Sequence, residues 1–252
     1  MKRLTEAWFE FKGVKSTDMG VLLRQMPTRF VPGTKYTRKA VAGRDGSILT
    51  GDGSYNDVSV RIECSVPDAD RLDAVLAWLT GFGELRFSDE PDKLYDASVE
   101  KEYSRVSIIP RCAGQRFTVT WTCAPIRRMY PAAEDMSFTE SGTAFTALGT
   151  YYALPRLAIH GSGAFSLTIA SGGHNSTMFF TSVPAAGILV DSERMDAMTM
   201  DGAGLLNHCI LEGSDDFFRI YPGTNTITWS AGDGDEAGSI TRIVMTPNWR
   251  FF

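Results

Sequence analysis

Histidine and cysteine often bind metals or act in catalysis, and the chain has three histidines and four cysteines. The histidines form no HExxH motif and no pair four residues apart, and the cysteines form no CxxC pair. These residues are His160, His174, His208, Cys64, Cys112, Cys123 and Cys209. We therefore expect no metal site, no cofactor and no catalytic cysteine. We interpret Cys64 and Cys123 as small core residues.

Carboxylates gather at two places, Asp215–Asp216 and Asp233–Glu236. A glycosidase needs two carboxylates that face each other across a cleft, whereas adjacent acids in polar turns are usually solvated. Asp233–Glu236 also lacks the spacing of an EF-hand, so we interpret it as a hairpin turn. No GxSxG elbow and no phosphate-binding loop accompany these acids. The sequence therefore predicts a protein that is not an enzyme.

The candidates for a carbohydrate contact are His174, Asn175 and Trp229. His174-Asn175 is similar to the histidine and asparagine of sugar-binding galectins. The rest of that pattern is missing, because no arginine follows soon after and no tryptophan is followed by a glutamate. A polar turn is the favoured interpretation of His174-Asn175. A carbohydrate-binding module that acts in host-surface attachment remains the alternative function.

The composition is that of a globular protein with a core. The chain has 252 residues, of which 43% are hydrophobic and 22% charged, and its formal net charge is -5. This charge argues against a dedicated nucleic-acid binder, which would carry a basic patch. No run approaches the roughly 18 apolar residues that a membrane span needs, and the first residues lack the apolar stretch of a signal peptide. We expect synthesis in the cytoplasm and no membrane insertion.

The elements expected in the first half are mostly strands. Apolar residues alternate with polar ones over Val58–Cys64 and over Phe117–Cys123, which predicts two half-buried strands. A single amphipathic helix is expected after Asp68, ended by Gly81 and Gly83. Its apolar stripe consists of Leu72, Val75, Leu76 and Leu79. Asp68 or Asp70 is expected to cap its first turn.

Turn signals divide the rest of the chain. Asp-Gly dipeptides within Tyr36–Tyr55 predict a hairpin or projecting loop. A boundary is expected near 125–133, where prolines interrupt the strand pattern. Beyond it, short strands alternate with turns such as Gly161-Ser162-Gly163 and Ser171-Gly172-Gly173. This spacing favours a sandwich or jelly roll.

Several motifs occur in one order along the chain. They are Phe11–Val14, Ser16–Val21, Gly43–Ile48, Gly53–Tyr55, Trp78–Pro91 with Tyr95 and Ala97, and Trp121–Pro125. In this order they resemble the distal tail protein (Dit) of siphovirus-type phages, over roughly residues 8 to 130. Three later stretches are similar to the C-terminal domain of the same family, namely Leu154–Gly163, Gly187–Glu193 and Tyr221–Ile227.

The resemblance implies a mainly β fold with two domains. Residues 1–130 would form a ring-forming, β-sandwich-like domain with one α-helix and a projecting hairpin. Residues 131–252 would form a galectin-like β-sandwich, or jelly roll. Because Trp249–Phe252 would be costly to leave in water, we expect residues 246–252 to pack back on the first domain or at a subunit contact.

The resemblance also implies a structural hub at the tail tip of a phage or prophage virion, assembled in the host bacterial cytoplasm. Such a hub is a homo-hexameric ring, single or paired back to back. It joins the tail tube protein to a tail fibre or tail-associated lysin and to a receptor-binding protein, and DNA meets it only in transit. Interface candidates in the Tyr36–Tyr55 segment are Gly43, Arg44, Asp45, Gly46, Gly53 and Tyr55. An ordinary surface hairpin is the alternative.

Overall fold

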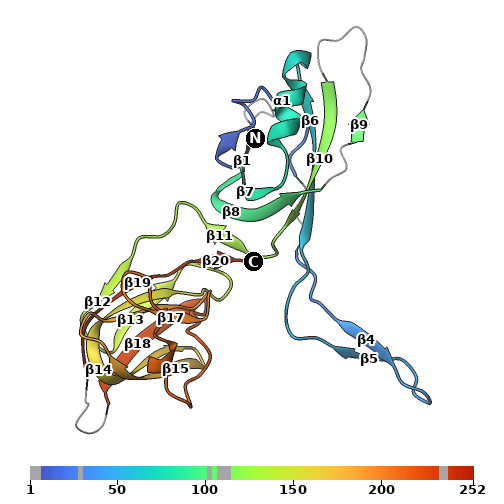
Figure 1. Cartoon of the computed structure of the whole chain (residues 1–252). Coiled ribbons are helices and arrows are strands. Elements are labelled where there is room, and N and C mark those ends of the chain that lie inside the picture. The colour runs from blue at the N-terminus through green and yellow to red at the C-terminus, as the bar shows by residue number, and fades with distance from the viewer. Residues whose placement is uncertain (1–6, 28–30, 101–103, 107–114, 233–237) are drawn as a thin grey trace. The chain divides into compact units, whose positions relative to one another are not determined.

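The computed structural model describes residues 7–27, 31–100, 104–106, 115–232 and 238–252. The chain divides into two compact units (Figure 1). Unit 1 is Met1–Tyr130 together with Phe252, and unit 2 is Pro131–Phe251. Both units consist mainly of curled β-sheets, so the predicted fold class is confirmed. Within the described ranges, no helix is long and apolar enough to cross a membrane.

Unit 1 is built on one antiparallel sheet with the strand order β2-β1-β7-β8-β10-β6-β3, in which β9 also pairs with β10 and β11 with β8. These strands are β1 (Phe9–Phe11), β2 (Val14–Lys15), β3 (Leu22–Leu23), β6 (Val58–Val66), β7 (Phe82–Phe87), β8 (Glu90–Val99), β9 (Ser104–Val106), β10 (Gln115–Cys123) and β11 (Arg127–Met129). A separate two-stranded sheet contains β4 (Thr37–Ala40) and β5 (Ser47–Thr50).

The core of unit 1 lies on one face of β6 and β10, as the alternation predicts. Val60, Ile62, Val119 and Trp121 are at most 4% exposed, and the two strands pair along their whole length. Aromatic rings surround Trp121. Phe9 meets it edge-on with the ring centroids 5.0 Å apart, a favourable geometry for the ring quadrupoles.

The helix is confirmed, but it is shorter than predicted. A 3₁₀ turn, η2 (Ala69–Arg71), leads into α1 (Leu72–Trp78). Asp68 caps the 3₁₀ turn by accepting a hydrogen bond from the Asp70 backbone N–H at 3.1 Å, whereas the N-cap of α1 is Arg71, without a side-chain cap. The helix ends before Gly81, and Gly83 lies inside β7 instead of ending the helix. The stripe faces the core, because Leu72, Val75 and Leu79 are buried.

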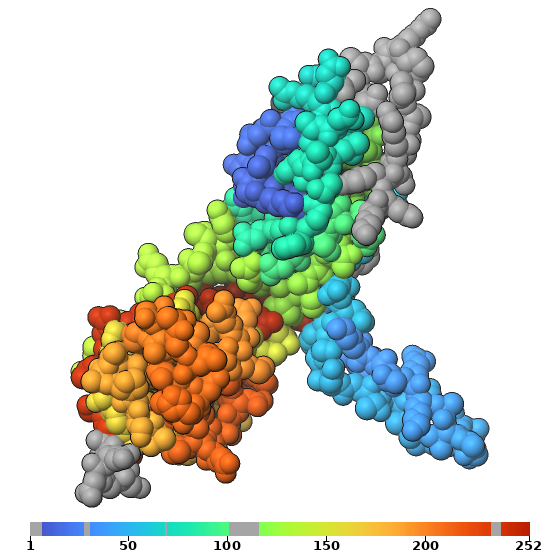
Figure 2. Space-filling model, in the orientation of Figure 1, coloured from blue at the N-terminus to red at the C-terminus, as the bar shows by residue number. Residues whose placement is uncertain are grey.

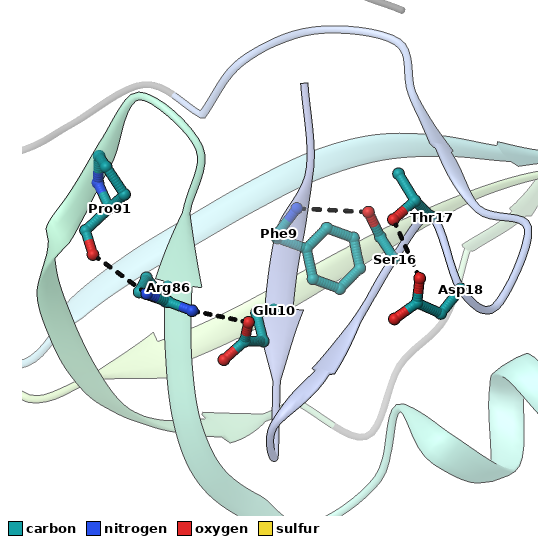
Figure 3. Close-up of polar contacts among 7 residues, drawn as sticks. All are labelled: Phe9, Glu10, Ser16, Thr17, Asp18, Arg86 and Pro91. Carbon is teal, nitrogen blue, oxygen red and sulfur yellow. Dashed lines mark hydrogen bonds and ion pairs between the residues drawn. The ribbon is translucent and has the colours of Figure 1, made fainter. Parts of the chain in front are cut away.

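The first strand is anchored by a half-buried ion pair (Figure 3). Arg86 on β7 donates to the Glu10 carboxylate on β1 at 2.7 Å and to the Pro91 carbonyl at 3.3 Å. The Arg86 guanidinium also lies 3.9 Å from the ring centroid of Tyr130, within the range of a cation–π interaction. These contacts join β1, β7, β8 and Tyr130, the residue that precedes unit 2 in the sequence.

Unit 2 is a β-sandwich that shares one long strand between its sheets. Its sheets contain β12 (Met136–Phe138), β13 (Thr143–Ala147), β14 (Arg156–Ser171), β15 (His174–Val183), β16 (Ile188–Asp191), β17 (Asp196–Met198), β18 (Gly223–Ala231) and β19 (Ser239–Thr246), with a 3₁₀ turn η3 (Asn207–Cys209). The short strand β20 (Arg250–Phe251) does not belong to these sheets. The first part of β14 pairs with β16 and β19, and its second part pairs with β15 and β18.

The prediction of a turn at Gly161-Ser162-Gly163 is wrong, because β14 runs through these residues without interruption. The register shifts here against β19 and β15, and Gly163 has φ +78. Glycines that mark a turn in the sequence can equally form a bulge that bends a strand. The segment 217–220 forms no strand, and Ile220 makes only an isolated bridge with Ala153. The turn at Gly172-Gly173 is confirmed, since it joins β14 to β15.

Candidate functional site

The interface candidates lie at the two ends of the hairpin formed by β4 and β5. Gly43, Arg44, Asp45 and Gly46 lie together at its tip, where both glycines have φ +77. Gly53 and Tyr55 lie at its base, and Tyr55 forms a bridge with Thr34. The structure therefore brings four of the six candidates together and places the other two a strand's length away.

Both faces of the hairpin are exposed to solvent. Every residue of β4 and β5 is exposed, and Figure 2 shows no other part of unit 1 packed on the visible side of the hairpin. Arg38 pairs with Leu49, and Lys39 pairs with Ile48. Cross-strand partners project to the same side and neighbouring residues to opposite sides. Each face therefore carries one cation beside one branched apolar residue.

The apolar surface of the hairpin is large for an element of this size. Tyr36 is 62% exposed and Leu49 is 54% exposed, and Val41 and Ile48 are also exposed. An isolated two-stranded hairpin is at best marginally stable in water, and contiguous exposed apolar residues mark interaction surfaces. The candidates predicted from the sequence lie at the tip and base of the hairpin, whereas the exposed residues Ile48 and Leu49 lie on its strand β5.

The hairpin is positively charged within an acidic chain. Between Thr34 and Ser54 there are four cations and two anions, while the whole chain has a net charge of -5. The four cations are Lys35, Arg38, Lys39 and Arg44. At the base, Asp52 accepts a hydrogen bond from the Ser54 backbone N–H at 2.9 Å, and its contacts with Ser54 lower the pKa of the Asp52 carboxyl. The cation-rich strands favour an acidic partner surface.

The base of the hairpin is anchored by the last residue of the chain. Tyr55 meets the Phe252 ring edge-on, with the centroids 4.8 Å apart, and Arg127 donates to the Phe252 carbonyl. Phe252 belongs to unit 1, whereas Trp249, Arg250 and Phe251 belong to unit 2. Of the six interface candidates, Tyr55 thus anchors the base of the hairpin within unit 1.

The three carbohydrate candidates do not form one site. His174 and Asn175 follow the β14–β15 turn, where His174 stacks on Tyr221 with the ring centroids 4.1 Å apart. Trp229 pairs with Leu167, four residues along β14 from Ser171, the partner of His174. At about 3.3 Å per residue, this separation is roughly 13 Å along the strand.

The other candidates for chemistry have structural surroundings. Burial raises the pKa of Cys64 and of Cys123 to about 12, so both thiols stay protonated at neutral pH. Asp215 accepts a hydrogen bond from the Thr177 backbone N–H at 2.8 Å, whereas Asp216 pairs with Arg219. The described part of the chain holds no group of three or more potential metal ligands. Cys112 and Asp233–Glu236 lie outside the described residues.

Comparison with protein-family models finds no match, and comparison with curated proteins finds none either. Among solved structures, the chain is similar to Dit (gp 19.1) of phage SPP1, described as a paradigm of the hub adsorption apparatus in phages that infect Gram-positive bacteria. The TM-score is 0.69 and the sequence identity 17%, and the match covers 98% of this chain and 99% of that one. The Dit-like fold predicted from the sequence is confirmed.

Proposed function

We propose that this protein is a distal tail protein, a ring-forming structural hub at the tip of a phage or prophage tail. The observation that carries the proposal is the likeness to the SPP1 hub protein across both units, because it covers 98% of the chain. Fold alone does not determine function, so the proposal also depends on a surface suited to assembly. The hairpin provides that surface.

The hairpin supports assembly with copies of the same chain. Its two open faces combine cations with apolar side chains, and the rest of the chain is acidic. A hairpin that contacts a different surface of the next copy makes a heterologous contact. Such contacts generate a closed ring when the rotation between neighbours closes. We propose a hexamer, single or as two rings back to back.

The proposed ring joins the tail tube protein to a tail fibre or tail-associated lysin and to a receptor-binding protein. DNA passes through its centre during infection, and the protein carries no catalytic activity of its own. A net charge of -5 per subunit suits such a passage, because an acidic surface does not retain phosphates. We propose the virion tail tip as its location, after assembly in the host cytoplasm.

Light scattering coupled to size exclusion tests the assembly, followed by negative-stain imaging of the same fractions. We expect six-membered rings or pairs of rings whose population grows with protein concentration. A monomer at every concentration, up to that of a crystallisation sample, would contradict self-assembly. Binding of the ring to duplex DNA at low salt gives a second readout, and micromolar affinity would contradict free passage of DNA.

A further inference from the structure

One face of unit 2 carries hydroxyl groups, and none of the side chains that its described strands present there is charged. It is the face of β13, β18, β14 and β15 that points away from the core, opposite the buried Phe165, Leu167 and Ile169. The register arranges its central side chains in three rows across β18, β14 and β15. The rows are Ser230–Ser166–Phe179, Thr228–Thr168–Thr177 and Thr226–Ala170–Asn175.

The hydroxyl groups of this face bond to one another across the strands. The Ser166 and Ser230 oxygens are 2.8 Å apart, and those of Thr168 and Thr177 are 3.0 Å apart. A hydroxyl has one hydrogen to donate and two lone pairs. Each bonded pair therefore retains one O–H and further lone pairs for an outside group, so the face can donate and accept side by side.

A groove of about 630 Å³ lies at one end of the face. Ser166 and Ser230 are among its lining residues, and Phe179 and Leu211 contribute apolar side chains that are 41% and 45% exposed. The Leu211 backbone N–H donates to the Phe179 carbonyl at 2.9 Å, which holds these two residues side by side. The groove therefore combines an exposed aromatic ring, an aliphatic side chain and a bonded hydroxyl pair.

We propose that this face, which we call the hydroxyl face, binds a neutral glycan. Sugar hydroxyls donate and accept like those of Ser166 and Ser230, and the C–H face of a sugar ring fits against Phe179. An anionic ligand would find no cationic side chain in the three rows. A protein partner is disfavoured because serine and threonine are under-represented among the residues that dominate protein interfaces.

The hydroxyl face differs from the carbohydrate site expected from the sequence. Of the three candidates, Asn175 lies on this face, whereas His174 and Trp229 pair with Ser171 and Leu167 on the core side. Glycan binding by unit 2 does not depend on the hairpin in unit 1. Loss of rings and loss of glycan binding are therefore separate experimental outcomes.

The full chain should be tested on an array of neutral hexose and N-acetylhexosamine oligosaccharides, printed beside uronic-acid and phosphorylated glycans. We expect retention on at least one neutral glycan, with a Kd of about 1 mM or lower by calorimetry. Phe179→Ala should weaken binding at least about tenfold, since it removes the ring against which a sugar packs. Ser230→Ala should weaken it severalfold by removing one hydroxyl.

Leu205→Ala is the matched control, because Leu205 is a 64% exposed apolar residue of unit 2 outside the groove. The affinity of Leu205→Ala for the glycan should equal that of the parent chain. Thermal unfolding should show that all variants are folded. Binding to none of the neutral glycans would overturn the proposal. Preference for anionic glycans, or full affinity in folded Phe179→Ala, would also overturn it.

Discussion

Arg128 lies between two carboxylates that would otherwise repel each other across neighbouring strands. Glu84 on β7 is the cross-strand partner of Asp96 on β8. The Arg128 guanidinium contacts Glu84 at 3.1 Å and Asp96 at 2.5 Å, and the hydrogen bond with Asp96 raises the pKa of Arg128. Like charges directly opposite each other destabilise a sheet, so the arginine offsets a repulsion that the strand register creates.

Replacing this arginine tests that account. Arg128→Met should lower the free energy of unfolding by about 0.5 kcal/mol at low salt, because the group is partly solvated. Urea titration measures the change, and the loss should shrink in the Glu84→Gln background, where only one carboxylate remains ionised. Arg219→Met is the control, since Asp216, its partner, is 87% exposed. Equal losses in both backgrounds would contradict the role of the carboxylate pair.

The buried thiols predict a loss of stability at alkaline pH. Their pKa is about 12 in the folded chain, against an ordinary value of 9.0. Above about pH 9, the unfolded chain therefore releases thiol protons that the folded chain keeps, and stability falls as pH rises. Each buried thiol should remove roughly 1.4 kcal/mol per pH unit beyond pH 9. The double variant Cys64→Ala, Cys123→Ala should show a shallower decline in urea titrations between pH 8 and 10.5, and parallel profiles would contradict the prediction.

At the scale of elements, the alternation of apolar and polar residues was sufficient to predict a strand where one face of that strand is buried. The pattern at Val58–Cys64 and Phe117–Cys123 predicted β6 and β10, because each alternate side chain enters the same core. The partners of Arg86 and Arg128 could not be predicted, since they follow from register between strands distant in sequence. Gly161 and Gly163 led to the prediction of a turn instead of a bulge, because both features have the same local sequence signature.

The bend of β14 depends on the missing side chain of Gly161. A Cβ at this position would lie 2.4 Å from the Ser239 carbonyl oxygen and 3.1 Å from the Ile240 Cα. Both are backbone atoms, so the sheet itself would have to move. Gly161→Ala should therefore destabilise unit 2 by about 2 kcal/mol in thermal or urea unfolding. In the control Gly33→Ala, the new Cβ meets nothing closer than 3.8 Å, and an equal loss there would contradict the steric explanation.

The apolar residues of the hairpin give a prediction for the element as a whole. Ile48→Ser combined with Leu49→Ser removes one apolar side chain from each face and should leave unit 1 folded, since neither residue belongs to its core. Ring formation should weaken by about tenfold or more, as judged by light scattering across a dilution series. Leu148→Ser with Leu205→Ser changes two leucines of unit 2 that are more exposed than Ile48 and Leu49, and this variant should assemble like the parent. Unchanged rings in the hairpin variant would contradict the proposed contact.

At the scale of the whole molecule, order along the chain carried more information than any single motif. The motifs from Phe11 to Pro125 predicted a Dit-like fold, which the likeness to the SPP1 protein confirms at only 17% identity. These motifs consist of turn residues and of the alternating residues of buried strands, whose local structure follows from the local sequence. The hydroxyl face could not be predicted in this way. Its serines and threonines come from three strands, β18, β14 and β15, and meet only after the sheet has formed.

The charge distribution predicts how assembly responds to salt. If the cation-rich hairpin contacts an acidic surface of the next copy, raising NaCl from about 50 to 500 mM should screen the attraction and raise the concentration at which rings form. Arg38→Glu with Lys39→Glu should prevent assembly at low salt, because one cation on each face becomes an anion. Arg194→Glu with Arg242→Glu makes the same change of net charge at exposed positions of unit 2 and should assemble like the parent. Equal loss in both variants would show that net repulsion alone controls assembly, and rings that persist in the hairpin variant would place the contact elsewhere.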